Sequence, residues 1–447
     1  MVCNRGGCPG VKGAAGTWHE GGITRLPLPG RISSTKEAVM GFNARSARTV
    51  IAVAALVGGL GAMTACGSKP AWKNPGDKSD TPATKEVATT VAAPANGATD
   101  VSTATEIGLA NAKPGSTVTI TDATGATVAG SMRADGQTWV PATQLKYATA
   151  YTVTVSGSDD SGKTTFTTMA KPGKTINVSV AMADGKTYGV AMPVVVRFGS
   201  DVSKDQRANI EKRLLVTSNP PQLGVWYWFS NNEVHYRPKD YWQSGTTLSV
   251  RLATGGLQLT GSAYGAKDVT VNATIGRKLV METDDASHQM TVAQDGQVIR
   301  TIPVSLGKSS TPSSSGAMVV MDKNKSEVFK GDASDPYVET VYYVQRVTIG
   351  GQYIHAAPWS VGDQGKRNVS HGCTNVSQDN AIWLYNLTIL GDPYTVKGTP
   401  RKLAWGDGWT DWDKPWEEYV KGSALPAPVE PAPAASSPAP SASASTN

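Results

Sequence analysis

Short runs in which polar and apolar side chains alternate recur along the chain from about residue 98 to residue 398. Because successive side chains of a β-strand point to opposite faces, a period of two predicts strands with one buried face. Val, Ile and Thr are frequent in these runs, and Asp-Gly or Ser-Gly pairs separate them, as is typical of strands joined by turns. The 447 residues include 47 Gly and only 5 Phe, and we predict a mainly β, multidomain protein.

The first two blocks of alternating runs resemble immunoglobulin-like β-sandwiches. The block at 98–180 has suitable strand lengths and turn spacing but lacks the cysteine pair of antibody domains. The block at 181–276 repeats the pattern and adds a predicted helix near 204–214. We expect its aromatic run, Trp226-Tyr227-Trp228-Phe229, to pack in the core or between domains, with a ligand-stacking face as the alternative.

The third block, 277–398, opens with strands that Asp295-Gly296 joins as a hairpin. Later strands flank a segment at 329–340 that we expect to be irregular. Ser377 is a suitable N-cap for a helix from Gln378 to about Leu387. This block is therefore a further β-rich domain with one short helix.

The N-terminal 97 residues carry the pattern of export and anchoring rather than of a folded domain. We predict that 1–39 is a non-native extension and that 40–65, with its arginines followed by a short apolar run, is a signal peptide. It ends before Cys66, the expected lipidation site; an uncleaved anchor helix is the alternative. Residues 66–97 are rich in Pro, Lys, Asp and Thr and predict a lipidated cysteine followed by a disordered tether.

The C-terminal part contains two compositionally distinct segments. Residues 399–421 form a Trp-rich extension, which we expect to pack against the preceding domain; a sugar-stacking platform is the alternative. Residues 422–447 are nearly all Ala, Pro and Ser and predict a disordered tail. The tryptophans are Trp405, Trp409, Trp412 and Trp416.

Charge and cysteine content exclude some classes of protein. The net charge is +6, and Lys and Arg are scattered, so we expect no nucleic-acid partner. No pattern predicts a cofactor. Cys3, Cys8 and Cys66 all belong to the predicted extension or lipid anchor, which leaves Cys373 without a thiol to pair with.

Residues 370–375, Ser-His-Gly-Cys-Thr-Asn, place a thiol, an imidazole and a carboxamide close together. A cysteine nucleophile reacts as the thiolate, so we expect a neighbouring base or backbone N–H groups to lower its pKa. His355 lies eighteen residues upstream at a predicted strand end. The N–H groups of Gly372 and Cys373 are candidates for an oxyanion site, because they precede a predicted helix.

The spacing from His355 to the Ser-His-Gly-Cys-x-Asn block resembles the L,D-transpeptidases, whose catalytic domain is of the YkuD type. The segment 354–362, Ile-His-Ala-Ala-Pro-Trp-Ser-Val-Gly, is similar to the mycobacterial and actinobacterial multidomain branch. The resemblance implies a lipoprotein on the outer face of the cell membrane that reaches into the cell wall. It also implies two immunoglobulin-like domains before the catalytic domain.

The same resemblance implies a cysteine acyltransferase that forms 3→3 peptidoglycan cross-links. Cys373 would attack a tetrapeptide stem, release D-alanine and hold the stem as a thioester. His355 would be the base, oriented by the backbone carbonyl of Ala356. His371 and Gly372 would line the oxyanion site, although His371 is equally suited to a supporting role.

Substrate contacts are implied for Tyr337, Ser370, Asn375 and Trp359; turn or packing roles are the alternatives for Tyr337 and Asn375. The implied partners are peptidoglycan stem peptides, the membrane through the lipid anchor, and a β-lactam such as a carbapenem as a covalent inhibitor. No metal is expected, although His355, His371 and Cys373 with Asp363 or Asp379 would form a plausible zinc ligand set.

Two other function classes remain open from the sequence. One is an L,D-carboxypeptidase or another wall-directed cysteine enzyme, in which water replaces the acceptor amine. A sortase is disfavoured because no Arg occurs between Cys373 and Arg401. The other is a non-catalytic lipoprotein that binds the cell wall through the sandwiches and tryptophans.

Overall fold

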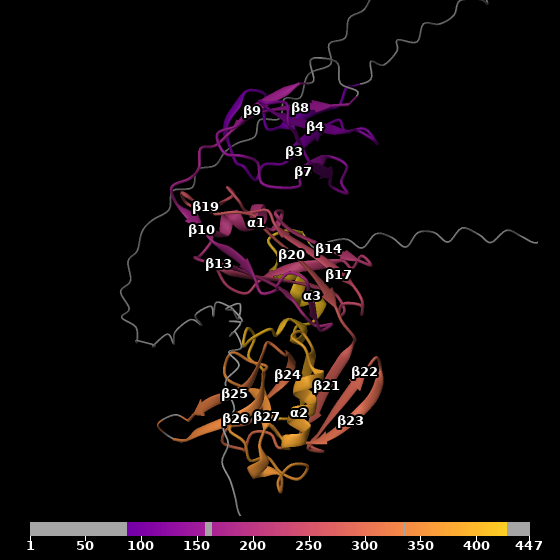
Figure 1. Cartoon of the computed structure of the whole chain (residues 1–447), viewed down its shortest axis with the longest axis vertical. Helices are drawn as coiled ribbons and strands as arrows, with labels where there is room; N and C mark the ends of the chain where they lie inside the picture. The colour runs from indigo at the N-terminus through magenta and orange to yellow at the C-terminus, as the bar shows by residue number, and fades with distance from the viewer. Residues whose placement is uncertain (1–86, 157–162, 332, 334–335, 427–447) are drawn as a thin grey trace, which may run out of the picture. The chain divides into compact units, whose positions relative to one another are not determined.

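The computed structural model describes residues 87–156, 163–331, 333 and 336–426. The predicted extension, signal peptide, Cys66, most of the tether and most of the tail lie outside these residues. Figure 1 shows that the described strands form successive groups along the chain, coloured from indigo through magenta to orange. None of the helices in these ranges is long and apolar enough to cross a membrane.

The first group of strands is a sandwich of two sheets, with strand orders β1-β3-β7-β6 and β2-β9-β8-β4-β5. The predicted alternation is clear in β8, where Tyr151, Val153 and Val155 are buried. They pack with Ile107 and Trp139 from the facing sheet in one apolar core. The strands are β1 (Thr90–Ala93), β2 (Ala98–Val101), β3 (Ile107–Ala110), β4 (Val118–Asp122), β5 (Thr127–Val128), β6 (Gly130–Met132), β7 (Thr138–Pro141), β8 (Ala150–Val155) and β9 (Thr164–Thr168).

Both predicted boundaries of this first domain were wrong. Strand β1 lies inside the predicted tether 66–97, yet it pairs with β3 in the sandwich. The strands at 175–180 lie inside the predicted first domain, yet they pair with strands of the second. The sequence of β1, Thr-Val-Ala-Ala, has small and mostly exposed side chains, so its composition resembles that of a tether. The pairing with β3, and not the composition of β1, makes this segment part of the sandwich.

The second group is also a sandwich, with strand orders β11-β13-β16-β15 and β12-β20-β17-β14 and a small third sheet β10-β19-β18. Strand β13 is buried at Val194, Val195 and Val196, because both of its faces are covered. The strands are β10 (Thr175–Ile176), β11 (Val178–Val180), β12 (Lys186–Tyr188), β13 (Val194–Phe198), β14 (Leu214–Asn219), β15 (Gly224–Trp228), β16 (Glu233–Pro238), β17 (Thr247–Leu252), β18 (Gln258–Thr260), β19 (Ala263–Gly265) and β20 (Val269–Ile275).

The predicted helix at 204–214 is present but short. A 3-10 turn at Lys204–Gln206 leads into α1 (Arg207–Glu211), and Leu214 already begins β14. The aromatic run on β15 packs as expected: Trp226 and Trp228 lie in the core of the sandwich.

The third group contains two sheets, ordered β23-β22-β21-β29-β24-β30 and β25-β26-β27-β28. A separate apolar core lies here, with Leu279, Met281 and Ile354 fully buried. The strands are β21 (Leu279–Asp284), β22 (Gln289–Gln294), β23 (Gln297–Pro303), β24 (Ser314–Val319), β25 (Asp322–Lys330), β26 (Val338–Arg346), β27 (Tyr353–Ala356), β28 (Thr374–Val376), β29 (Pro393–Lys397) and β30 (Arg401–Lys402).

Helix α2 (Gln378–Leu387) has the predicted bounds, and the Ser377 side chain accepts a hydrogen bond from the Asn380 N–H. The expectation of an irregular segment at 329–340 was wrong in part. Strands β25 and β26 form a long antiparallel hairpin that pairs Lys330 with Val338, so the connection is confined to 331–337. The hairpin is largely exposed, so β25 consists mainly of polar and charged residues and lacks the alternation with apolar residues that predicts a strand.

The Trp-rich extension and the residues after it form a segment that we call the C-terminal strap, residues 399–426. It was expected on the preceding catalytic domain, but its aromatic side chains pack mainly on the second sandwich. Trp405 stacks on Phe229 with 4.6 Å between ring centroids, and Trp412 donates to the carbonyl oxygen of Ala191 at 2.8 Å. Its residues include a 3-10 turn at Asp411–Asp413, α3 (Trp416–Tyr419) and a 3-10 turn at Val420–Gly422.

The strap continues past the predicted start of the disordered tail at 422. The Ser423 hydroxyl and the Ala424 N–H both donate to the carboxylate of Glu211, each at 2.6 Å. Residues 423–424 therefore belong to the folded strap, because they satisfy a carboxylate that is buried in the second sandwich.

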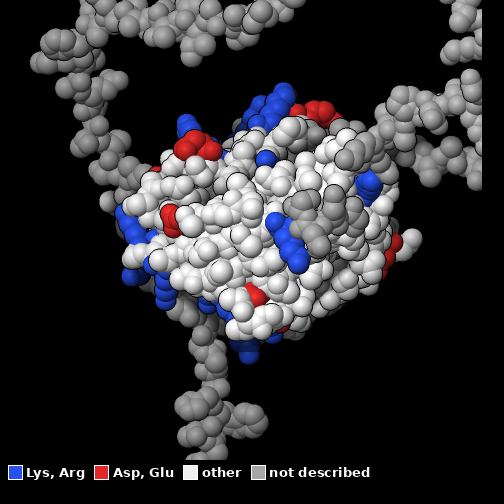
Figure 2. Space-filling view, turned by 90° about the horizontal axis from the view of Figure 1, so that it is seen from above, with Lys and Arg blue, Asp and Glu red and all other residues white. Residues whose placement is uncertain are grey.

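Surface charge is mixed in sign on the face drawn in Figure 2, where Lys and Arg are interspersed with Asp and Glu over a largely uncharged surface.

Candidate active site

The parallel pairing of β27 with β28 brings the two halves of the sequence motif together. His355 stands opposite Asn375 in this pairing, and Cys373 immediately precedes β28. All four residues of β27 are buried, so the strand holds His355 rigidly inside the domain. The 17 residues between the two strands return the chain to the same end of the sheet, as a parallel connection requires.

The loop before Cys373 is braced by Ser370. The Ser370 hydroxyl donates to the carbonyl oxygen of Cys373 at 2.7 Å and accepts from the Gly372 N–H at 3.1 Å. Gly372 has φ of +121°, which side-chain-bearing residues rarely adopt. The expectation that the Gly372 N–H faces a substrate carbonyl is therefore wrong for this structure, because Ser370 already accepts from it.

A cavity of about 370 Å³ opens at this end of the sheet. Of the predicted site residues, it brings together His355, Cys373, His371, Ser370, Asn375, Tyr337 and Trp359. Its other lining residues are Phe329, Glu339, Val341, Ser360, Asp363 and Val369. The catalytic and substrate-contact candidates therefore share one site, apart from Gly372 and Ala356, which do not line the cavity.

His355 is anchored through one ring nitrogen. Its Nδ1 lies 2.9 Å from the carbonyl oxygen of Ala356, as predicted, and a carbonyl oxygen only accepts, so Nδ1 carries the proton. Nε2 is therefore left as the basic nitrogen. Burial lowers the pKa of this imidazole, so the ring is neutral at physiological pH. Phe329 holds the ring edge-on at 5.5 Å.

Cys373 is 9% exposed, and its environment is the opposite of the one expected from the sequence. Burial raises the pKa of the thiol to about 12, with a further small contribution from the carboxylate of Glu327. Its Sγ donates to the carbonyl oxygen of Gly351 at 3.9 Å, and not to His355. The resting pair is therefore a neutral thiol and a neutral imidazole in one cavity.

The rim of the cavity carries His371 and Tyr337. Their rings stack with 4.7 Å between centroids, and His371 Nε2 lies 3.0 Å from Lys308 Nζ. Because an ammonium group only donates, Nε2 is the accepting nitrogen of His371. Tyr337 belongs to the 331–337 connection, so the hairpin brings it over the site. Trp359 is also at the opening and is 56% exposed.

Asn375 presents an unsatisfied acceptor in the wall of the cavity. Its Nδ2 donates to the hydroxyl of Ser360 at 3.2 Å, and that hydroxyl donates in turn to the carbonyl oxygen of Ala357. This chain fixes the orientation of the amide. Asn375 is 3% exposed, and its Oδ1 has no hydrogen-bond partner among the residues that the structure describes. A buried acceptor of this kind is costly unless a ligand supplies a donor.

Sequence reasoning missed Ser360, Phe329 and Glu339. Ser360 and Phe329 orient Asn375 and His355, but neither belongs to a motif around a nucleophile. The adjacency of Pro358-Trp359-Ser360 to His355 was a usable indication for Ser360. Phe329 had no such indication, because the hairpin that delivers it was read as irregular.

The zinc alternative finds no support in the geometry. Within 87–426, leaving aside the positions outside the description, no group of three or more His, Cys, Asp or Glu side chains is arranged to hold a metal ion.

Family models match two parts of the chain. Residues 279–396 match the model described as the L,D-transpeptidase catalytic domain, YkuD. Residues 98–258 match the model of a bacterial immunoglobulin-like domain, Big_10. The first match contains all the cavity residues, and the second spans most of both sandwiches.

Two relatives from Mycobacterium tuberculosis are similar over most of the chain. L,D-transpeptidase 2 is 34% identical over 69% of this chain and 78% of its own length. L,D-transpeptidase 5 is 36% identical over 70% of this chain and 71% of its own length. A solved structure of L,D-transpeptidase 3 from the same organism, in complex with a faropenem-derived adduct, is 29% identical over 49% of this chain and 97% of that chain, with a TM-score of 0.42.

Proposed function

The chain belongs to the L,D-transpeptidase family, and we propose that it is a peptidoglycan transpeptidase that forms 3→3 cross-links through a thioester on Cys373. The observation that carries the proposal is the cavity itself. It combines the described chain's one free thiol with an imidazole whose Nδ1 is anchored and whose Nε2 is basic. That is the arrangement that nucleophilic catalysis by cysteine needs.

In the first half-reaction, Cys373 Sγ attacks the carbonyl carbon at the L-centre of the third residue of a tetrapeptide stem. The thiol proton passes to His355 Nε2 and then to the amine of the departing D-alanine. The C–N bond breaks, and the stem remains as a thioester.

In the second half-reaction, an amine on the third residue of a neighbouring stem attacks the thioester. Its proton passes to His355, the new amide forms, and the thiol is regenerated. The two half-reactions together balance in atoms and charge, and they regenerate the free enzyme.

The protonation states of the resting pair constrain how the thiolate forms. Burial raises the thiol pKa to about 12 and lowers the imidazole pKa below its ordinary 6.5, so both shifts favour the neutral thiol and the neutral imidazole before substrate binds. A preformed ion pair is therefore scarce. We propose that proton transfer accompanies attack, after substrate displaces water from the cavity.

Asn375 positions the stem in this proposal. Its Oδ1 accepts an N–H of the bound peptide, which satisfies an acceptor that no described residue of the chain pairs with. Trp359 and Tyr337 cover the stem from the opening, and Ser370 acts indirectly by holding the loop before Cys373. His371 remains a candidate for the oxyanion site or for support of Tyr337.

Muropeptide analysis tests the reaction. Incubation of the protein with tetrapeptide-containing peptidoglycan is expected to yield new 3→3 dimers and free D-alanine, and the Cys373→Ala variant is expected to yield neither. Tripeptides without dimers would contradict transpeptidation and indicate an L,D-carboxypeptidase. Absence of any product from folded protein would contradict both enzymes and favour a wall-binding role.

We also propose that a carbapenem acylates Cys373, because the strained β-lactam carbonyl presents the same electrophile as the stem. Intact-mass spectrometry is expected to show one adduct on the wild type and none on Cys373→Ala. An adduct that persists in the variant would contradict the assignment of the nucleophile.

Anchoring by lipid on Cys66, on the outer face of the cell membrane, completes the proposal; the sequence pattern at 40–66 supports it. Labelling with a fatty acid in a bacterial host is expected to depend on Cys66. Equal labelling of Cys66→Ala would contradict lipidation at this residue.

A further inference from the structure

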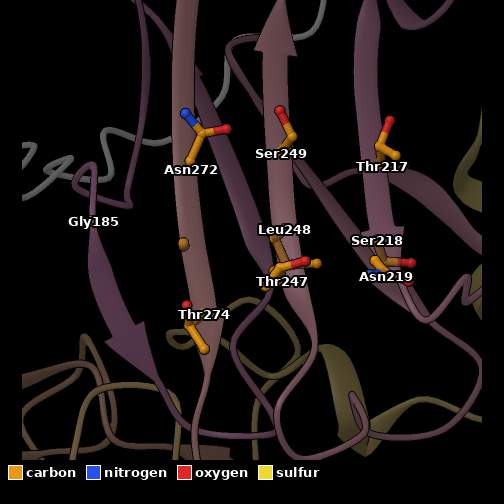
Figure 3. Close-up of a pocket in the computed structure, with 10 residues that line it drawn as sticks. Gly185, Thr217, Ser218, Asn219, Thr247, Leu248, Ser249, Asn272 and Thr274 are labelled. Carbon is orange, nitrogen blue, oxygen red and sulfur yellow. The ribbon is translucent and has the colours of Figure 1, made fainter.

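The outer face of one sheet of the second sandwich carries a shallow hollow of about 300 Å³. Figure 3 shows hydroxyl and amide side chains on neighbouring strands β14, β17 and β20 lining it. Six of them form what we call the polar grid: Thr217, Asn219, Thr247, Ser249, Asn272 and Thr274. The hollow belongs to the β12-β20-β17-β14 sheet and is separate from the catalytic cavity.

The strand pairing arranges the grid as two rows. Ser249 of β17 is opposite Thr217 on one side and Asn272 on the other. Two residues away, Thr247 is opposite Asn219 and Thr274 in the same way. Neighbouring strands lie about 4.8 Å apart, so each row offers a hydrogen-bonding group at about that interval.

The polar grid is available to a ligand. All six side chains are exposed, whereas the intervening residues Leu248, Val250 and Ala273 are buried and fix the register of the face. Within the described residues, Asn272 alone among the six makes a side-chain hydrogen bond, to Asp184 at 3.4 Å. The other five side chains keep their hydrogen-bonding capacity free.

The composition of the hollow selects a class of partner. Its remaining lining residues are Gly185, Ser218, Leu248 and Ala273, so no ionised side chain lines it. A polyanion would be matched by Lys and Arg, and an apolar partner by apolar side chains. Asn is disfavoured in strands, so propensity alone does not account for Asn219 and Asn272.

We propose that the polar grid binds the glycan backbone of peptidoglycan, an uncharged stretch of N-acetylated, hydroxyl-rich β-linked sugars. The proposal rests on the proposed function, which attaches the substrate stems to such a backbone. Successive β-linked sugars repeat at nearly the interval between strands, so a glycan lying across β14, β17 and β20 meets one polar side chain per sugar. The second sandwich then holds the polymer while the catalytic cavity acts on its stems.

The test uses chitohexaose, a neutral oligosaccharide of N-acetylglucosamine that carries no stem peptide. Full-length protein with Cys373→Ala is titrated and binding is followed by isothermal calorimetry. Saturable binding is expected, and Thr247→Ala with Ser249→Ala is expected to weaken it at least about fivefold, since two hydrogen-bonding groups are lost. The matched control is Thr270→Ala, an exposed position of β20 outside the hollow.

The outcomes separate the two proposals. Binding by the Cys373→Ala protein supports the grid whether or not the wild type forms cross-links, and the Thr247→Ala, Ser249→Ala variant is expected to acylate with a carbapenem at the wild-type rate. No binding of chitohexaose, or equal weakening by Thr270→Ala, would overturn the grid proposal. Loss of a concentration-dependent dimer in the double variant, without glycan binding, would overturn it in favour of self-association.

Discussion

His355 and His235 are both almost fully buried, yet their partners give the two imidazoles opposite charge. His355 is 4% exposed, and its one hydrogen bond goes to a neutral carbonyl oxygen. His235 is fully buried, with Nδ1 3.0 Å from Asp411 and Nε2 2.9 Å from Glu233. Both nitrogens of His235 therefore donate to carboxylates, whereas one nitrogen of His355 stays basic.

The pKa shifts follow from these partners. Burial alone lowers both values, but Asp411 and Glu233 outweigh it and raise the pKa of His235 to about 9. Burial is not offset in this way at His355, whose pKa is lowered. The two carboxylates beside His235 keep that imidazole protonated, in a structural role. The single carbonyl beside His355 leaves that imidazole neutral, with one nitrogen able to accept a proton. Burial of a histidine by itself therefore indicates neither role.

His235 also ties two regions together. It lies on β16 of the second sandwich, and Asp411 lies in the C-terminal strap, where it also accepts from the Tyr419 hydroxyl at 2.7 Å. The strap thus closes on a charged network beneath the aromatic side chains of Phe229 and Trp405.

Of the substitutions that test the different roles of the two histidines, His355→Ala should have the largest effect, and this effect should be on the rate of acylation. Loss of the base is expected to lower the rate of acylation by roughly 10³-fold. The measurement is the acylation rate with a carbapenem, followed by mass spectrometry. A variant that acylates at the wild-type rate would show that another group takes the thiol proton.

Replacement of His235 by Ala should act in the opposite sense, on stability and not on chemistry. It leaves the buried Asp411 and the partly buried Glu233 without their shared cation, which is expected to cost about 3–5 kcal/mol of unfolding free energy. Urea denaturation followed by tryptophan fluorescence of the strap measures it. Unchanged stability would mean that the network contributes little.

The two histidines should also make the free energy of unfolding depend on pH in opposite directions. Protonated His235 stabilises the folded protein, and this contribution is complete below pH 6.5, the ordinary pKa of histidine. About 3 kcal/mol of unfolding free energy is lost as pH rises through the folded-state pKa of about 9. The lowered pKa of His355 has the opposite sign, because the unfolded chain binds the proton first as pH falls below 6.5.

Urea denaturation from pH 5 to pH 10 separates these slopes. His235→Gln is expected to remove the alkaline loss and His355→Gln the acidic one. If both variants keep both slopes, other groups govern the pH dependence.

The thiol should resist simple alkylation although it accepts a β-lactam. A pKa of about 12, against an ordinary 9.0, lowers the thiolate fraction about 10³-fold. A more basic thiolate is also more nucleophilic, and this compensates about half of the loss in the logarithm of the rate. Iodoacetamide is therefore expected to react about 30-fold more slowly than with free cysteine. Alkylation as fast as that of free cysteine would indicate a preformed thiolate.

The smallest effect is expected at Ala356. Its contribution to His355 is a backbone carbonyl, so Ala356→Ser keeps the hydrogen bond and is expected to change the acylation rate by less than about twofold. A larger loss would show that packing around the 1%-exposed methyl group, and not the carbonyl, positions His355.

Much of the fold could be predicted from local pattern. The alternation in β8, the turn at Asp295-Gly296 and the cap at Ser377 are decided within a few residues, so these elements were placed nearly as they stand. The motif around Cys373 likewise identified the residues of the cavity. Strand β1 and the exposed hairpin β25–β26 were missed, because their stability comes from partner strands and not from their own composition.

The sequence by itself therefore identified the candidate residues of the site: one thiol, the histidine eighteen positions before it, and an asparagine two positions after it. Only the tertiary structure decided their states. Depth of burial raised the pKa of the thiol, the Ser360 hydroxyl fixed the orientation of the Asn375 amide, and the carboxylates of Asp411 and Glu233 kept His235 charged. The physical reason is that pKa and hydrogen-bond satisfaction depend on the field and solvent around a group, and residues remote in sequence supply both.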